Sequence, residues 1–227
     1  MLPRKREIEM FQRSTGFTLI ELMITVVIVA IGVSLAVPSW NNLVQKRRTT
    51  GGAEEIAAFL ASAQSEAVKR NELVTVTIQR NGAGTDWCVG AINETQMDIV
   101  VETHCHCNQD DPARDKYCEF DDGQPRRITQ DGFEKFAMDL AAVAGIANDH
   151  FFFSFDPVRG IKLAENGAVV NEVNSVTIMS DNTHYKLQVD ISVTGRVRVC
   201  NPDSSKKVPG FVDCGIGPIV LPPPIPL

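Results

Sequence analysis

Six cysteines and two neighbouring histidines are the residues of this 227-residue chain whose types could support metal or redox chemistry. His104 and His106 alternate with two of the cysteines, and a tetrahedral zinc site needs four ligands, usually nitrogen or sulfur. The spacing matches no common zinc motif, however, and oxidation to disulfides would compete for the thiols. We therefore expect disulfides and no metal site from Cys88, Cys105, Cys107, Cys118, Cys200 and Cys214.

The sequence favours one disulfide in particular, between Cys200 and Cys214. They flank a turn-rich segment, residues 201–213, which contains two prolines and a glycine. A bridge that closes so short a loop would stabilise the fold by about 3 kcal/mol on the chain-entropy model. The other four cysteines pair among themselves in one of three ways, and Cys105 and Cys107 are too close in sequence to favour each other.

The remaining residues indicate no catalytic centre. The chain has no nucleophile elbow, phosphate-binding loop or metal-hydrolase motif. No sequence context marks a catalytic site around the histidines, and His184, beside a predicted strand, is expected to be exposed or half-buried. We therefore expect a protein that is not an enzyme and that needs no cofactor. The four histidines are His104, His106, His150 and His184.

A second informative group of residues surrounds the junction between Gly16 and Phe17. A charged leader, residues 1–16, precedes it, and an apolar run without charges, residues 22–37, follows it. Glu21 is the ionisable group beside that run, and a carboxylate costs roughly 2.5–3.5 kcal/mol at a bilayer centre, less near the interface. Cleavage at the junction would create an α-amino cation that a neighbouring subunit could offer to Glu21. Because the small residue precedes the apolar run, unlike in a secretory signal peptide, cleavage would leave that run on the mature chain.

The charge balance limits the partners of the chain. The leader carries a net charge of +2, so removing it from a chain of net charge −6 leaves −8. Basic residues before the apolar run keep the amino terminus in the cytoplasm and predict export of the rest. The strongly negative mature charge argues against wholesale electrostatic binding to nucleic acid, although it allows a local basic patch.

The segment Gly16-Phe17-Thr18-Leu19-Ile20-Glu21-Leu22 resembles the class III signal of type IV pilins and of the pseudopilins of type II secretion. In that signal a basic leader ends in Gly, Phe follows, and Glu lies near the start of a hydrophobic helix. Pro38 matches the helix-kinking proline common in these proteins. The resemblance implies cleavage by prepilin peptidase after Gly16, N-methylation of Phe17, and roles for Glu21 and Pro38 in filament assembly.

The elements that must position these residues are a long helix followed by strands. Apolar residues at spacings of three and four along residues 40–68, together with the apolar run, predict a helix from Phe17 to about Lys69. Such a helix would be about 80 Å long. Gly51-Gly52 is its predicted weak point, since each glycine costs up to about 1 kcal/mol against alanine, and Gln64 is expected on its polar side. Alternating residues predict strands at 73–79, 87–92, 97–101, 151–155, 175–180, 185–193 and 196–200, with a turn at 81–84 joining the first two as a hairpin.

These elements divide the chain into four parts. They are the leader 1–16, a hydrophobic stem helix and transmembrane segment 17–52, a globular domain 53–217, and a proline-rich tail 218–227 that favours extended conformation. Within the globular domain, a segment at about 103–149 carries three cysteines, an acidic stretch and a candidate helix around Ala137 to Ala147. It indicates a disulfide-tied insertion.

Further motifs resemble the GspH/FimT family of minor pilins and pseudopilins. The family implies an α+β fold shaped like a lollipop, with a long N-terminal helix as the stem and a small C-terminal antiparallel two-sheet β domain. It also implies packing of the helix into a filament core, and minor members help to start assembly at or near the filament tip. The insertion and the tail depart from the family pattern. The matching motifs are residues 65–71, residues 87–90, residues 153–160 and residues 194–200.

The segment Gly195-Arg196-Val197-Arg198 indicates a second function through the same resemblance. In FimT-type proteins a Gly-Arg-X-Arg motif contributes to binding of incoming DNA during natural transformation. Arginines two apart on a strand face the same side and can both reach phosphates, and Lys206 and Lys207 could extend this patch. Alternatively, Arg196 and Arg198 pair with carboxylates of the domain, and the motif also occurs in FimU-like pilins whose primary role is structural.

Three functions are therefore compatible with the sequence. We favour a structural minor pilin at or near the tip of a type IV pilus, where it primes assembly for twitching motility and adhesion. The alternatives are a DNA-binding minor pilin for natural transformation and a minor pseudopilin of type II secretion. The expected partners are other minor and major pilins, prepilin peptidase, the inner membrane before assembly and, for the second function, double-stranded DNA. We expect a single-pass inner-membrane protein with a periplasmic domain that later joins the pilus at the cell surface.

Overall fold

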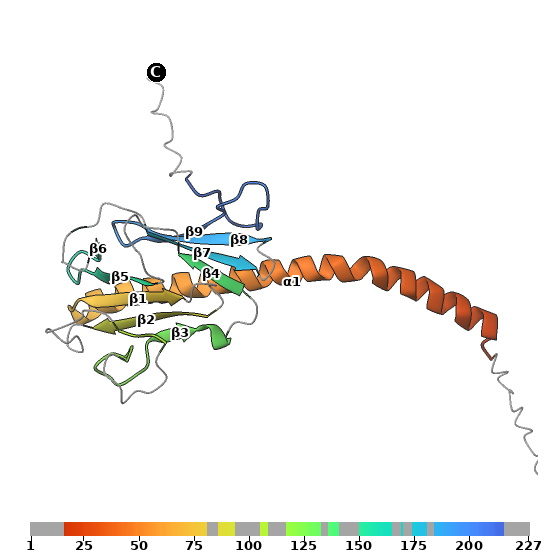
Figure 1. Cartoon of the computed structure of the whole chain (residues 1–227), viewed down its shortest axis with the longest axis horizontal. Helices are drawn as coiled ribbons and strands as arrows, with labels where there is room; N and C mark the ends of the chain where they lie inside the picture. The colour runs from red at the N-terminus through yellow and green to blue at the C-terminus, as the bar shows by residue number, and fades with distance from the viewer. Residues whose placement is uncertain are drawn as a thin grey trace, which may run out of the picture. The chain divides into compact units, whose positions relative to one another are not determined.

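The computed structural model describes residues 16–80, 86–93, 105–108, 117–132, 136–140, 150–164, 169, 174–180 and 184–215. It has the expected α+β architecture, in which one long helix is followed by two antiparallel sheets (Figure 1). The chain divides into two compact units, residues 1–42 and residues 43–227. Several predicted features lie outside the described residues: the leader up to residue 15, the turn at 81–84, the strand at 97–101, His104, the tail 218–227 and the side chain of Pro38.

Helix α1, Leu19–Arg70, confirms the predicted long helix and begins two residues after Phe17. Thr18 precedes the helix as its N-cap, since its Oγ1 accepts a hydrogen bond from the backbone N–H of Glu21 at 3.3 Å. The apolar side chains of residues 19–37 are exposed. In the part of the chain that the structure describes, α1 is the one helix long and apolar enough to cross a membrane, judged by length and composition.

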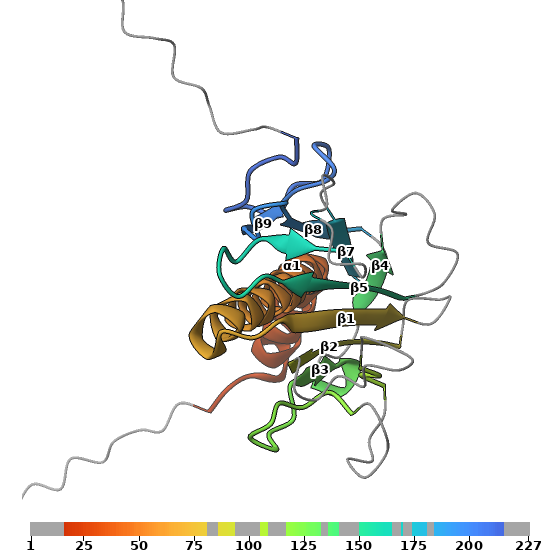
Figure 2. The same cartoon turned by 90° about the vertical axis from the view of Figure 1, so that its left-hand side faces the viewer.

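The second half of α1 belongs to the compact unit 43–227 and packs through the predicted apolar stripe. Ile56, Leu60, Ala63 and Ala67 are buried, and Phe59 is partly buried against them. They join core residues from both sheets, so the helix closes a single core with the strands (Figure 2). Buried and half-buried residues alternate along residues 174–180 and 186–191, because successive side chains of a strand point to opposite faces, whereas residues 87–93 are buried throughout.

The first sheet has five strands in the order β3-β2-β1-β5-β6, and the second has four in the order β4-β7-β8-β9. All neighbouring strands are antiparallel, and the predicted hairpin is present as β1 paired with β2. The short 3-10 helix η2, Gln130–Gly132, follows β3. The strands are β1 Val74–Arg80, β2 Trp87–Asn93, β3 Arg127–Thr129, β4 Phe136–Leu140, β5 His150–Phe155, β6 Lys162–Leu163, β7 Asn174–Ser180, β8 Lys186–Ile191 and β9 Val197–Cys200.

The candidate helix around Ala137 to Ala147 is wrong where the structure describes it. Residues 136–140 form strand β4, in which Phe136 and Met138 are buried and Met138 pairs with Ile178 of β7. The alternation is short, and alanines beyond it favour helix by composition, so local propensity loses to sheet pairing. The predicted insertion therefore supplies strands to both sheets, β3 to the first and β4 to the second.

Gly52 shows why the two adjacent glycines leave α1 unbroken. Gly51 is exposed, and a Cβ there would meet nothing within 4 Å. A Cβ on Gly52 would lie 2.6 Å from Cζ of Phe136, so the missing side chain admits the aromatic ring of β4 against the helix. The predicted weak point is thus a packing site at Gly52, and burial of the ring offsets the low helix propensity of glycine.

Candidate functional site: the assembly junction and the carboxyl-terminal turn

The predicted cleavage junction lies ahead of the first helical turn. Gly16, Phe17 and Thr18 precede α1 and are exposed, and Phe17 retains 77% of its accessible surface. Backbone outside a helix is available to a protease, because its amide groups are not committed to helical hydrogen bonds. The geometry therefore leaves the Gly16–Phe17 bond open to cleavage.

Glu21 lies in the first turn of α1, where its negative charge faces the positive end of the helix dipole. Thr18 and Glu21 have the spacing of a capping box, a signal that sequence reasoning missed. The Thr18 hydroxyl caps the helix, and among the described residues the Glu21 carboxylate has no ion-pair partner. Glu21 thus remains available to a cation from outside the chain.

Gly195 of the Gly-Arg-Val-Arg segment has a structural function. It adopts a φ of 74°, and a Cβ on it would lie 2.2 Å from the carbonyl oxygen of Gly160 and 2.3 Å from Nε2 of Gln64. Gln64 Nε2 donates to that Gly160 oxygen at 2.7 Å. Two glycine turns from different parts of the sequence therefore meet at one side chain of α1.

Gln64 does not lie on a solvent-facing side of the helix, although the sequence predicts that it does. It is partly buried, and besides Gly160 it also reaches the carbonyl oxygen of Thr194 at 3.5 Å. A glutamine among acidic residues looks like a solvent-facing position in sequence. Its role appears only when the turns at Gly160 and Gly195 are brought to the helix, so no local signal could have identified it.

Arg196 and Arg198 have different surroundings. Arg196 is exposed, and its backbone N–H donates to Ser192 Oγ at 3.0 Å, while no ion-pair partner of its side chain lies among the described residues. Arg198 lies on β9 opposite Asp190 of β8, and its Nη2 is 3.4 Å from the Asp190 carboxylate. The proposed pairing of this arginine with a domain carboxylate is thus observed for Arg198.

The two lysines of the following loop are also engaged. Lys207 Nζ forms an ion pair with Asp213 at 2.6 Å, and Lys206 Nζ donates to Nδ1 of His184 at 3.3 Å. Within the described residues, a carboxylate therefore neutralises two of the four candidate DNA-binding cations, Arg198 and Lys207. His184 is exposed, within the expected range.

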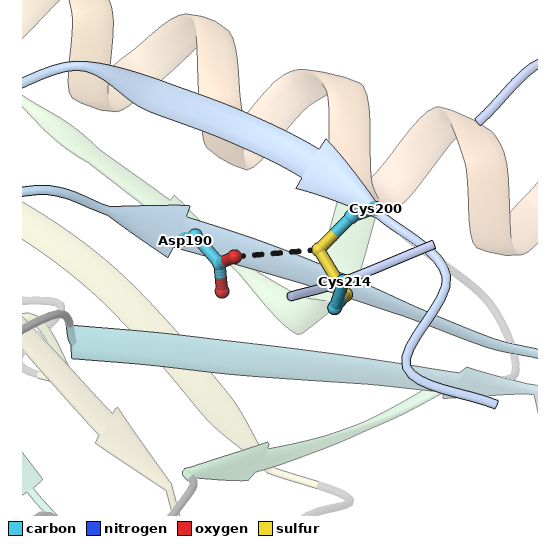
Figure 3. Close-up of side chains that lie close together, drawn as sticks. All are labelled: Asp190, Cys200 and Cys214. Carbon is cyan, nitrogen blue, oxygen red and sulfur yellow. Dashed lines mark hydrogen bonds between the residues drawn. A yellow bond between two sulfur atoms is a disulfide. The ribbon is translucent and has the colours of Figure 1, made fainter. Parts of the chain in front are cut away.

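Cys200 and Cys214 form a disulfide at the end of β9, the pairing that the sequence favours (Figure 3). Asp190 Oδ2 lies 3.3 Å from Cys200 Sγ, but a disulfide sulfur has no proton to donate. These three residues are close enough to suggest a metal cluster. The disulfide removes both thiolates, however, so the group cannot coordinate a metal through sulfur in this state.

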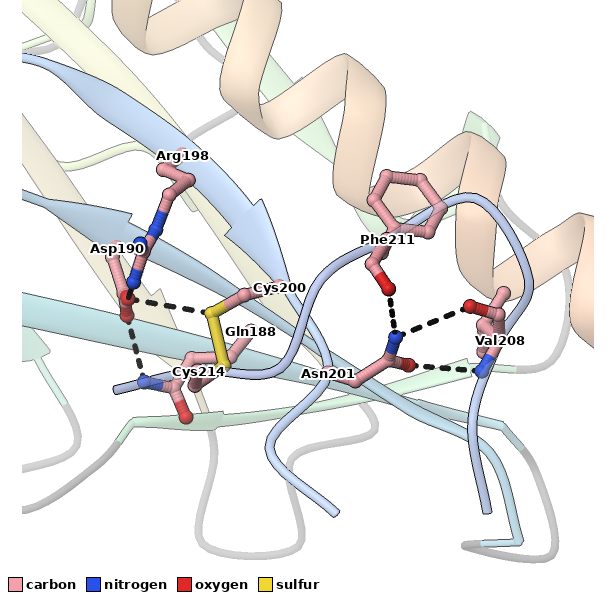
Figure 4. The surroundings of a disulfide bond; sticks show 8 residues. All are labelled: Gln188, Asp190, Arg198, Cys200, Asn201, Val208, Phe211 and Cys214. Atoms are coloured by element: carbon pink, nitrogen blue, oxygen red, sulfur yellow. Dashed lines mark hydrogen bonds and ion pairs between the residues drawn. A yellow bond between two sulfur atoms is a disulfide. The ribbon is translucent and has the colours of Figure 1, made fainter. Parts of the chain in front are cut away.

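Asn201 holds the loop that the disulfide closes. Its Nδ2 donates to the carbonyl oxygens of Phe211 and Val208 at 2.7 and 3.2 Å, and its Oδ1 accepts from Val208 N–H at 2.9 Å (Figure 4). Asn201 is 1% exposed. The loop of residues 201–213 is therefore a fixed surface and not a free connection.

The other four cysteines form a double-disulfide cluster on β2, with bonds Cys88–Cys107 and Cys105–Cys118. A Cβ on Gly90 would lie 2.3 Å from Sγ of Cys118, so glycine lets the sulfurs approach the strand. Both bonds consume the thiols that could have bound zinc. The structure thus selects one of the three pairings that the sequence left open.

Arg70, at the end of α1, organises a further polar group that sequence reasoning missed. It forms ion pairs with Glu66 at 2.8 Å, with Asp122 at 3.0 Å and with Asp121, and its guanidinium lies 4.9 Å from the ring centre of Phe120. The hydrogen bond from Arg70 holds the pKa of Glu66 below its usual range, although desolvation opposes it. This network ties the disulfide-bonded segment to the helix.

Comparisons with known proteins extend these observations. A family model described as type II transport protein GspH matches residues 52–208, and one described as the prokaryotic N-terminal methylation motif matches residues 11–37. A "Fimbrial protein" of Pseudomonas aeruginosa is 30% identical over 83 residues, which are 37% of this chain and 52% of that protein. The chain thus spans about half the length of this curated relative.

Two solved structures are similar at low sequence identity. The Pseudomonas aeruginosa type IV minor pilin FimU is 19% identical, with 70% of this chain and 92% of that chain covered and a TM-score of 0.40. The minor pseudopilin EpsH of the Vibrio cholerae type 2 secretion system is 9% identical, with 69% and 99% covered and a TM-score of 0.41.

Proposed function

Since this chain belongs to the GspH family of minor type IV pilins and pseudopilins, we propose that it is a structural subunit at or near the tip of a type IV pilus that helps to prime assembly. The observation that carries the proposal is the first part of α1. Residues 19–37 expose apolar side chains, while residues 43–227 form a compact unit with their own core. Such a helix needs lipid before assembly and neighbouring helices afterwards, because exposed apolar surface is unfavourable in water.

Glu21 supplies the contact that makes this helix fit a filament. Its carboxylate stands at the edge of the apolar run, where an unpaired charge is costly. Cleavage after Gly16 by prepilin peptidase frees the α-amine of Phe17, and that amine of one subunit pairs with Glu21 of another. The basic leader favours a single-pass inner-membrane protein with its domain in the periplasm before assembly.

A clean deletion tests the pilus function. We expect it to reduce or abolish surface pili and twitching motility, and the chain itself to restore both. Glu21→Ala should enter the membrane normally but fail to restore pili. Glu54→Ala, which removes an exposed carboxylate from the same helix, is the matched control and should restore them. Normal piliation in the deletion strain would contradict the proposal.

The processing step has a separate test. Gly16→Val should block cleavage because a larger side chain occupies the position that the peptidase reads, so the chain keeps its leader. Mass spectrometry of the membrane-bound protein measures this directly. An unchanged mature mass in Gly16→Val would show that Gly16 is not the processing residue.

The alternative of a minor pseudopilin rests on the same helix and family. It predicts that the deletion strain no longer secretes its enzymes but still has intact pili. The same strain therefore distinguishes a role in the type IV pilus from a role in type II secretion. DNA binding has less support, because Arg198 and Lys207 already carry carboxylate partners. A DNA-binding role would require a salt-dependent shift of DNA by the purified domain that Arg196→Ala with Arg198→Ala removes.

A further inference from the structure

The described cations of the compact unit fall into two groups. Those of the first group each lie within 4 Å of a carboxylate: Lys69, Arg70, Arg80, Arg126, Arg198 and Lys207. In the second group, no carboxylate lies within ion-pair distance among the described residues. Three lysines of this group, Lys46, Lys186 and Lys206, together with His184 are called the basic patch below. Lys46 lies over the ring of Tyr185, Lys206 contacts His184, and Lys186 follows Tyr185 at the start of β8.

Contacts with aromatic rings connect Lys46 and Lys206 of the basic patch through Tyr185 and His184. Lys46 Nζ of α1 lies 5.0 Å from the ring centre of Tyr185, which is buried. The His184 ring meets the same tyrosine edge-on at 5.0 Å, and Lys206 Nζ lies 3.3 Å from His184 Nδ1. A cation over an aromatic face keeps its full charge, since the ring is attracted electrostatically without neutralising it.

Among the described residues, Asp203 is the carboxylate whose pKa the lysines of the patch lower. The pKa of Asp203 lies below its usual range. Hydrogen bonds from Ser205 are the main cause, and the nearby positive charges of Lys206 and Lys186 add to it. Asp203 Oδ1 is committed to the Ser205 backbone N–H at 2.8 Å and hydroxyl at 2.6 Å. Among the described residues, three lysines against this one carboxylate give the patch a positive charge, in a chain whose net charge is negative.

The patch is also fixed in place. Lys206 stands on the loop that the Cys200–Cys214 disulfide closes and that Asn201 holds from inside. Lys46 stands on α1, and Lys186 on β8. Three separate elements therefore present the charges at positions that the fold determines.

We propose that the basic patch binds the phosphate headgroups of anionic lipids and so docks the compact unit on the membrane before assembly. Lys46 follows Val37, the last residue of the apolar run, by nine residues, which is about 14 Å of helix. The headgroup layer extends several ångströms beyond the hydrocarbon core, so Lys46 lies within about one Debye length of it. Trp40, between the two, is 67% exposed and of the type enriched at membrane interfaces.

Hydrogen exchange of the full chain in nanodiscs tests the proposal, which rests on the proposed membrane insertion of α1. One disc contains phosphatidylcholine alone, and the other contains one third phosphatidylglycerol. We expect slower exchange at backbone amides of residues 184–186 and 201–208 on the anionic disc, and loss of this difference at high salt. Each basic residue near an anionic surface contributes about a fivefold preference, so Lys46→Gln with Lys206→Gln should weaken docking about 25-fold.

The matched control is Arg159→Gln with Arg196→Gln. These two exposed arginines lie elsewhere on the unit, and their removal changes the net charge equally. The control should keep the lipid-dependent protection. Equal exchange on both discs, or equal loss in the two double variants, would overturn the inference. Failure of the chain to enter either disc would contradict the proposed function together with it.

Discussion

Gly195→Ala gives the most direct test of how the two glycine turns hold α1. The change adds one methyl group at a residue with a φ of 74°. A non-glycine residue in this left-handed region costs about 1–2 kcal/mol. The new Cβ would also lie 2.2 Å from a backbone oxygen, that of Gly160, which no side-chain rotation can move away.

The expected destabilisation follows from these two effects. Separating the turns enough to admit the methyl group breaks the hydrogen bond from Gln64 to Gly160, worth about 1 kcal/mol. Together with the backbone cost, the free energy of unfolding should fall by about 2–3 kcal/mol. With a urea dependence of about 2 kcal/mol per molar, the unfolding midpoint of oxidised residues 43–227 should fall by about 1–1.5 M.

Gly123→Ala is the matched control for this experiment. Gly123 has a similar φ of 69°, but a Cβ there would meet nothing within 4 Å. The free energy of unfolding of Gly123→Ala should fall only by the cost of the left-handed backbone, about 1–2 kcal/mol. If Gly195→Ala destabilises no more than Gly123→Ala, the close approach of the turns to Gln64 is not what requires glycine.

Three further predictions concern other contacts of the unit. Gly51→Ala should stabilise the unit by up to about 1 kcal/mol because it removes a glycine from the interior of the helix. Gly52→Ala should destabilise the unit because its Cβ would overlap the ring of Phe136. Equal urea midpoints of the two variants would refute the packing of this ring on Gly52. Gly90→Ala should leave free thiols in the oxidised protein, since its Cβ would occupy the space of a sulfur, and quantitative thiol labelling that finds none would contradict this. Glu66, with its pKa lowered by Arg70, stabilises the fold above its unfolded pKa, and this contribution is lost as pH falls through the lower folded value. Acid titration of stability should therefore be shallower for Glu66→Gln, and an unchanged profile would refute the contribution.

Prediction from sequence was most successful where the signal is local. The apolar stripe, the alternation of the longer strands and the hairpin of β1 with β2 each depend on residue types within a few turns or a single strand. Prediction was poor between residues 103 and 149, where β3 and β4 are short. A strand of three to five residues carries too few alternations to be distinguished from helix or loop.

The candidate site shows the same division. The Gly16–Phe17 junction and Glu21 were predicted from residues close together in the chain, and their roles stay predictions. Arg196 and Arg198 were predicted as one patch from their spacing, but their environments differ for a reason that spacing cannot show. Arg198 lies opposite a carboxylate of β8, and strand register decides that pairing.

The sequence by itself determined a long helix whose first part is apolar on all sides and a β-rich domain with an even number of cysteines, and it predicted a cleavage junction ahead of the helix. Only the tertiary structure decided which cysteines pair and why Gly52, Gly90 and Gly195 must lack a side chain. These outcomes depend on contacts between residues far apart in the chain, such as Gln64 with Gly160. Closing two sheets on one helix creates those contacts, and short-range residue patterns carry no information about them.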